Sequence, residues 1–328
     1  MPAALILMLM AGLILSGCSA GTLDNSGTQS SDPANASEGK KLQIVTTLFP
    51  QYDFARQIAG DKAEVKMLLK PGEESHSYEP TPQDIIAIQN CDLFIYVGGE
   101  NDAWVEDILD SVSRDKMKTL RLVDCVNTVE EQHVEGMKEE RQKEHEEEHA
   151  EETEYDEHVW TSPQNAMKIT ERIFELLCEL DEKDTDVFQK NESTYRQKLE
   201  ELDAGFQKIV DESPHKTLLF GDRFPFLYFT EEYGLKYYAA FPGCASDTEP
   251  SAATMAFLIN KVKDDKIPVV LKIELSSDNI ANAIAEATGT KVKVFYSCHN
   301  ISAEDFKNGE TYLSMMEKNE ETLKEALK

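Results

Sequence analysis

Histidines with neighbouring carboxylates are the residues of this chain best suited to binding a metal ion. The 328-residue sequence contains seven histidines, and six of them sit where metal chemistry could use them. His76 lies in the string HSYEPTPQD, and His158 lies in EHVWTSP. A neutral imidazole nitrogen binds borderline metals such as zinc, and nearby carboxylates concentrate the cation electrostatically. The pattern predicts a protein that captures a metal ion.

Three further histidines lie in a strongly acidic stretch between these two strings. Residues 130–157 contain fourteen Asp or Glu against three Lys or Arg, and carry His133, His145 and His149. One interpretation is a solvated loop with no further role. The other is a weak, flexible capture site, since KEHEEEHA places His145 and His149 four residues apart, on one face if the segment is helical.

The charge of the whole chain narrows the classes of partner and of activity. A formal net charge of −29 argues against nucleic acid and anionic membrane surfaces as binding partners, because both would repel the chain, and favours a cationic ligand. The sequence has no HExxH, no GxSxG and no glycine-rich phosphate loop. These absences predict a binding protein and not an enzyme.

The N-terminus has the pattern of a targeting segment. Residues 3–15 are apolar over the length of a signal-peptide core and are too short to span a bilayer. They end in LSGC, the pattern cleaved before a lipid-modified cysteine, which is Cys18 here. We therefore expect a signal peptide over 1–17 and a lipidated flexible linker over 18–40. The mature protein would be anchored to the cell membrane on its extracytoplasmic face.

Strand-like and helix-like runs alternate along the rest of the chain. Alternation of this kind predicts an α/β fold with parallel sheets. We expect two lobes, each a roughly four-stranded parallel sheet flanked by helices. The predicted strands are 41–49, 63–69, 92–98 and 118–124 in the first lobe, and 216–220, 236–241, 268–274 and 291–297 in the second.

A long helix is expected to join the two lobes. Over 184–212, apolar residues recur at intervals of three and four, as one buried helix face requires. Such a rigid connection would limit hinge bending to small lobe movements. The expected order is an N-terminal lobe (41–129), the acidic His-containing loop (130–157), the end of that lobe (158–183), the linking helix (184–212) and a C-terminal lobe (213–328).

Four candidate ligands follow predicted strands. His76 follows the second strand and His158 the fourth, while Asp222 follows 216–220 and His299 follows 291–297. In open parallel sheets, ligands bind beyond the carboxyl ends of the strands. The sequence thus predicts a metal site in a cleft between the lobes.

Specific strings resemble a known family. HSYEPTPQD around His76, GGENDAWVEDIL at 98–109, HVWTSPQNA around His158 and EPS at 249–251 are similar to the metal-binding lipoproteins of bacterial zinc and manganese ABC importers, the cluster A-I solute-binding family. The resemblance covers nearly all of 41–328. It implies a monomeric receptor that delivers its metal ion to an ABC permease in the membrane. A surface adhesin or interaction lipoprotein on the same scaffold is an alternative.

The resemblance implies His76 and His158 as ligands from the first lobe. The second lobe departs from the family pattern. Where many members carry His or Glu, this chain reads FGDRFPF and Asp222 is the nearest ligand; where Asp or Glu is usual, it reads FYSCHNIS and offers His299. Three histidines with Asp222 would form a four-coordinate site suited to Zn²⁺. Mn²⁺ prefers more oxygen ligands and stays as the second possibility.

The cysteines leave two alternatives open. Export permits disulfides, and Cys244 and Cys298 both follow a strand of the second lobe. They could form a disulfide, or Cys298 could bind the metal ion, and only geometry decides between these.

Overall fold

The computed structural model describes residues 40–73, 78–99, 102–112, 117–132, 134–137, 155–243, 245 and 249–328. Residues 41–328 form one compact unit. Several residues singled out above lie outside the described residues: Cys18, His76, His133, His145, His149 and Cys244.

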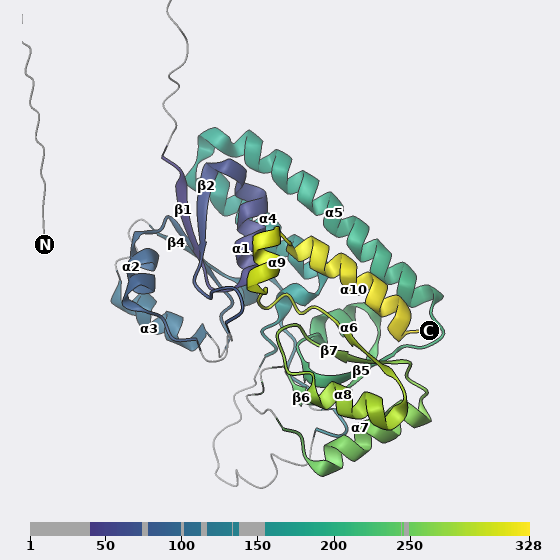
Figure 1. Ribbon diagram of the computed structural model, residues 1–328. Helices are drawn as coiled ribbons and strands as arrows, with labels where there is room; N and C mark the ends of the chain where they lie inside the picture. Colours follow the sequence, from purple (N-terminus) through teal and green to yellow (C-terminus); the bar gives the residue numbers. More distant parts are fainter. Residues whose placement is uncertain are drawn as a thin grey trace, which may run out of the picture. The chain divides into compact units, whose positions relative to one another are not determined.

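The first sheet has four parallel strands in the order β2-β1-β3-β4 (Figure 1). Its side chains alternate between two helical layers, as the period of two in a strand requires. Phe94 packs with residues of α2 and α3, whereas Leu93 and Ile95 belong to the core shared with α1, α4 and α5. The bounds are β1 Leu42–Thr46, α1 Phe49–Ala59, β2 Ala63–Met67, α2 Pro82–Asn90, β3 Leu93–Tyr96, α3 Ala103–Ser111 and β4 Lys118–Arg121.

The second sheet repeats this topology, with parallel strands in the order β6-β5-β7-β8. Leu219 and Val270 face residues of α7 and α8, while Phe220 and Leu271 face the core that includes Phe206 of α5 and Leu323 of α10. The bounds are β5 Thr217–Phe224, α6 Leu227–Tyr233, β6 Lys236–Pro242, α7 Ala252–Asp264, β7 Val269–Lys272, α8 Asn279–Thr288, β8 Lys291–Val294, α9 Ala303–Asn308 and α10 Tyr312–Ala326.

Two helices that lie between the two sheets in the sequence contribute many residues to the hydrophobic core that both sheets share. Helix α4 (Pro163–Leu180) begins where Ser162-Pro163 predicts: the Ser162 side chain accepts a hydrogen bond from Asn165 N at 3.0 Å. Helix α5 (Thr185–Glu212) contacts α1 and α4 of the first half and α6 and α10 of the second, and in Figure 1 it runs past both sheets. The predicted α/β architecture with two four-stranded parallel sheets is confirmed.

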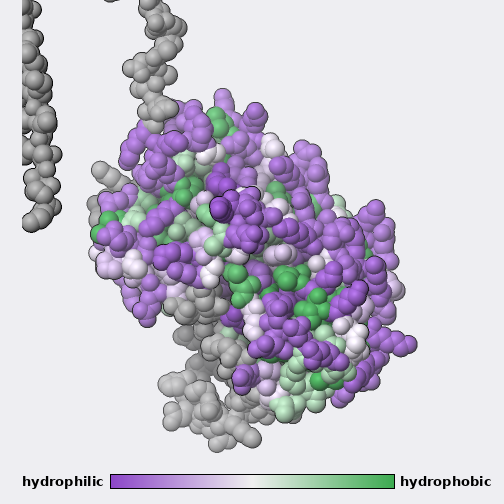
Figure 2. Space-filling model, viewed as in Figure 1, coloured by the Kyte–Doolittle hydropathy of each residue, from purple (hydrophilic) through white to green (hydrophobic). Residues whose placement is uncertain are grey.

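One cluster of buried hydrophobic residues extends through both halves. It contains Ile44 of the first sheet and Phe220 of the second, together with the buried face of α5. Packed interiors resist deformation; the restriction of lobe movement itself stays a prediction. Outside it, the face seen in Figure 2 is mostly hydrophilic, with smaller hydrophobic areas between.

Candidate metal site

A cavity of about 130 Å³ is lined by residues of both halves of the chain. Glu73 and His158 come from the first half, and Arg223, Glu274 and His299 come from the second. Two of the predicted ligands, His158 and His299, are thus brought together although 141 positions separate them in the sequence. Their ring centroids lie 5.2 Å apart, with the ring planes at 84°.

His158 has the environment of a metal-binding imidazole. It is fully buried; its backbone N donates to Asp156 Oδ1 at 2.7 Å, and its Nδ1 lies 3.2 Å from the same oxygen. Its Nε2 is buried and has no hydrogen-bond partner among the described residues. Histidines that ligate a metal typically give one ring nitrogen to a carboxylate and the other to the ion.

The same carboxylate controls the protonation of His158. Burial lowers the pKa of His158, but the negative charge of Asp156 and its hydrogen bond outweigh burial, so the pKa lies above its ordinary value. The imidazole must be neutral to bind a metal ion. Binding is therefore expected to weaken as the pH falls.

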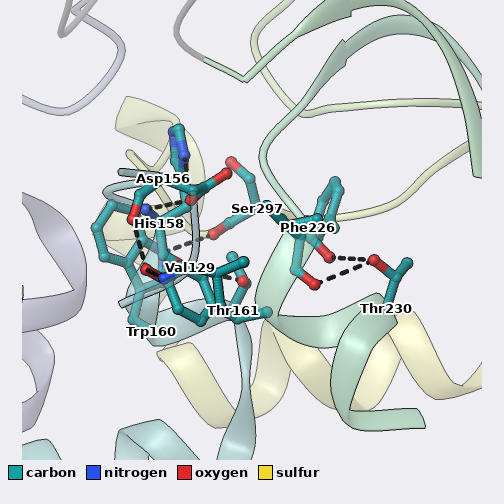
Figure 3. Close-up of polar contacts among 10 residues, drawn as sticks. Val129, Asp156, His158, Trp160, Thr161, Phe226, Thr230 and Ser297 are labelled. Carbon is teal, nitrogen blue, oxygen red and sulfur yellow. Dashed lines mark hydrogen bonds and ion pairs between the residues drawn. The ribbon is translucent and has the colours of Figure 1, made fainter. Parts of the chain in front are cut away.

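Trp160 connects the two histidine-bearing segments, a role that sequence reasoning missed. Its ring centroid lies 5.5 Å from that of His158 and 5.3 Å from that of His299. Its Nε1 donates to the carbonyl oxygen of Ser297 at 2.8 Å (Figure 3). The Tyr312 hydroxyl donates to the Trp160 carbonyl at 2.7 Å. The bond from Trp160 to Ser297 joins the 158–160 turn to the 297–299 turn.

Glu274 is a further cavity residue that sequence reasoning did not single out. It follows β7 by two residues, the kind of position at which strand-end ligands occur, and this signal could have found it. Burial raises the pKa of Glu274 to about 7, although hydrogen bonds from the backbone and side chain of Ser297 act to lower this pKa.

Asp222 occupies a different position from the one predicted. Strand β5 does not end at Phe220 but continues to Phe224, with a register shift between Phe220 and Arg223, so Asp222 lies within the strand. Its Oδ1 accepts from Arg223 N at 2.8 Å. Its Oδ2 accepts from Ile273 N at 3.0 Å and from the Ser276 hydroxyl, and burial raises its pKa. These bonds tie β5 to the segment after β7, and metal ligation by Asp222 stays a prediction.

The chain next to His76 is bonded to the His299 segment. The Asn300 side chain donates to the carbonyl oxygens of Lys70 at 3.0 Å and Glu73 at 2.7 Å. Gly72 N donates to the Ile301 carbonyl at 2.8 Å. His76 itself lies outside the described residues, within which no three His, Cys, Asp or Glu side chains form a metal cluster.

The remaining predicted residues are only partly described. Cys298 forms no disulfide with another described residue and is fully buried, and burial raises the pKa of its thiol well above the ordinary value. Its pairing with Cys244 stays a prediction, as does metal capture by His133, His145 and His149. The two ends of the acidic loop are joined, because Glu130 and Tyr155 form an antiparallel bridge.

Comparison with known proteins shows the family of this chain. The family model described as zinc-uptake complex component A, periplasmic, matches residues 44–326. The chain belongs to this family. Among the described residues, no helix is both long enough and apolar enough to span a membrane.

Individual members of the zinc-uptake family are similar over most of this chain. The zinc-binding lipoprotein AdcA of Streptococcus pneumoniae strain R6 is 36% identical over 287 residues, which are 87% of this chain but only 56% of AdcA. The high-affinity zinc uptake system protein ZnuA of Bacillus subtilis strain 168 is 33% identical, covering 92% of each protein. The crystal structure of the Zn(II)-bound ZnuA-like domain of S. pneumoniae AdcA superposes with a TM-score of 0.72 at 33% identity, covering 88% of this chain and 99% of that one.

Proposed function

We propose that this chain captures zinc outside the cytoplasm and delivers it to an ABC permease. The observation that carries the proposal is His158: a buried imidazole held at Nδ1 by a carboxylate, with Nε2 lacking a hydrogen-bond partner among the described residues, in a cavity that His299 also lines. Zinc binds well to three imidazole nitrogens with one oxygen ligand. His76, His158 and His299 would supply the nitrogens.

Further support comes from the relatives, which are named for zinc binding and zinc uptake. Anchoring through lipid on Cys18 and docking of a monomer on the permease belong to the same proposal. Catalysis has no place in it, since a receptor surrounds the ion with protein ligands and releases it unchanged.

The test is an equilibrium zinc titration with a competing chelator. His158→Ala and His299→Ala are each expected to weaken binding by more than about 100-fold, more than changes outside the ligand set usually cost. The matched control is His215→Ala, because His215 is an exposed histidine distant in sequence from both strings. An unchanged zinc affinity in His158→Ala would overturn the proposed site. The same titration can also test the acidic loop: if the wild-type protein binds a second, weaker zinc ion that is lost when His145 and His149 are replaced, the loop captures zinc.

Delivery is tested separately. The cognate permease in lipid vesicles should hydrolyse ATP faster with zinc-loaded protein than with the metal-free protein or with His158→Ala at the same protein and zinc concentrations. Equal stimulation by loaded and metal-free protein would contradict delivery while leaving zinc capture intact.

A further inference from the structure

The segment that presents His299 is held by one buried carboxylate. Glu274 Oε2 accepts from the backbone N of Ser297 at 2.7 Å, and its Oε1 accepts from the Ser297 hydroxyl at 2.8 Å. The same hydroxyl oxygen accepts from the backbone N of His299 at 3.2 Å. A continuous chain of hydrogen bonds therefore runs from Glu274 through Ser297 to His299.

This turn needs such a restraint. Cys298, between the two bonded residues, has φ of +58°, a left-handed conformation that residues with a Cβ adopt at a cost. A strained backbone persists only where its surroundings impose it. Other bonds hold neighbouring groups: Trp160 holds the Ser297 carbonyl, and Asn319 holds both backbone groups of Tyr296 at 2.7 and 2.8 Å. Glu274 is the carboxylate that holds both the backbone N and the hydroxyl of Ser297, and this hydroxyl in turn accepts from the backbone N of His299.

We propose that Glu274 is a positioning residue for metal binding: it fixes the 297–299 turn so that the His299 imidazole faces His158 across the cavity. The inference rests on the proposed function. Glu274 lines the same cavity, yet both of its oxygens are already bonded to Ser297, which suits a carboxylate that orients a ligand. Removal of such an outer partner usually weakens metal binding 10–100-fold.

The experiment is a double-mutant cycle read by zinc affinity. Glu274→Gln, His299→Ala and the double variant are titrated with zinc against a chelator. Glu274→Gln should weaken binding about 10–100-fold in the wild-type background, but less than about threefold in the His299→Ala background, because residues that act through one another are not additive. Glu304→Gln is the matched control: it removes an exposed carboxylate of α9, five positions after His299 in the sequence and outside the cavity lining.

A spectroscopic readout separates positioning from a loss of stability. Co²⁺ bound in place of zinc reports ligand identity and geometry through its visible absorption. The Co²⁺ spectrum of Glu274→Gln should shift toward that of His299→Ala, whereas Glu304→Gln should keep the wild-type spectrum. Ser297→Ala removes the middle of the hydrogen-bond chain without touching the carboxylate, so it tests the same claim should Glu274→Gln fold poorly, and it should also lower zinc affinity.

The outcomes distinguish the inference from the proposed function. If Glu274→Gln lowers zinc affinity by the same factor in the wild-type and the His299→Ala backgrounds, Glu274 does not act through His299. Wild-type zinc affinity and a wild-type Co²⁺ spectrum in both Glu274→Gln and Ser297→Ala would also overturn the inference. Failure of the proposed function looks different: zinc affinity would then be insensitive to His158→Ala and His299→Ala as well.

Discussion

Replacing Asp156 by Asn tests how the carboxylate at Nδ1 of His158 affects the affinity of this imidazole for a metal ion. Asp156 is buried and its Oδ1 faces both the backbone N and the Nδ1 of His158, at 2.7 and 3.2 Å. Asparagine keeps a carbonyl oxygen that can accept from the backbone N. The charge on the Nδ1 contact is lost, and bonds to a charged partner are roughly twice as strong as neutral ones. The substitution thus removes polarisation of the imidazole with little change in shape.

Two consequences with opposite pH dependence follow. At pH 8 zinc affinity should fall about 10–100-fold, the usual effect of removing a carboxylate from a metal-bound histidine, which is about 1.4–2.8 kcal/mol. Asp156 also raises the pKa of His158, so without it the pKa falls and protons compete with zinc only at lower pH. In the wild-type protein, each pH unit below that raised pKa should cost about tenfold in affinity for this proton. The difference between the two proteins should therefore shrink as the solution is acidified.

The assay is a chelator-competition titration of zinc at half-unit steps from pH 8 to pH 5.5. Asp124→Asn is the control, since it removes an exposed carboxylate from the same half of the chain, and should follow the wild-type curve. An Asp156→Asn affinity equal to wild type at pH 8, or a ratio that stays constant down to pH 5.5, would refute this reasoning.

Three further substitutions test the supports of the site. Trp160→Phe leaves the buried Ser297 carbonyl without its 2.8 Å donor and should lower the free energy of unfolding in urea by about 1–3 kcal/mol; an unchanged midpoint would contradict the bridging role. Asp222→Asn breaks bonds between β5 and the segment after β7 and should cost about 1–3 kcal/mol of stability while weakening zinc binding far less than His158→Ala; equal weakening would make Asp222 a ligand. Phe295→Ala removes a fully buried ring whose centroid lies 5.0 Å from that of Phe226 and 5.4 Å from that of Phe229. It should lower the free energy of unfolding by about 3–5 kcal/mol; a loss below about 1 kcal/mol would show that the aromatic cluster repacks.

The architecture was accessible from sequence because it follows from local patterns. Alternating strand-like and helix-like runs predicted both sheets, and the apolar spacing of 184–212 predicted α5, which spans Thr185–Glu212. The predicted end of β5 at Phe220 was wrong, because the strand continues through a register shift past Gly221 and Asp222. Such an irregularity is set by pairing with β6, and residue types alone do not reveal it.

Two of the candidate ligands were predicted from different signals. His158 was found from the string HVWTSP and His299 from its position after the last predicted strand, and the structure brings both side chains to one cavity. The partners of these histidines depend on contacts between distant segments: Asp156 was counted only as part of the acidic loop, and the bond from Trp160 to Ser297 joins residues 137 positions apart. The role of Glu274 likewise depends on how the turn after β8 folds back toward β7, which no local pattern specifies.

The most direct test of zinc capture is a crystal structure grown with one equivalent of zinc, with data collected on both sides of the zinc absorption edge. The predicted result is one strong anomalous peak about 2.0–2.1 Å from Nε2 of His158, within bonding distance of His299 and His76. A zinc peak confined to residues 130–155, with none beside His158, would contradict the account.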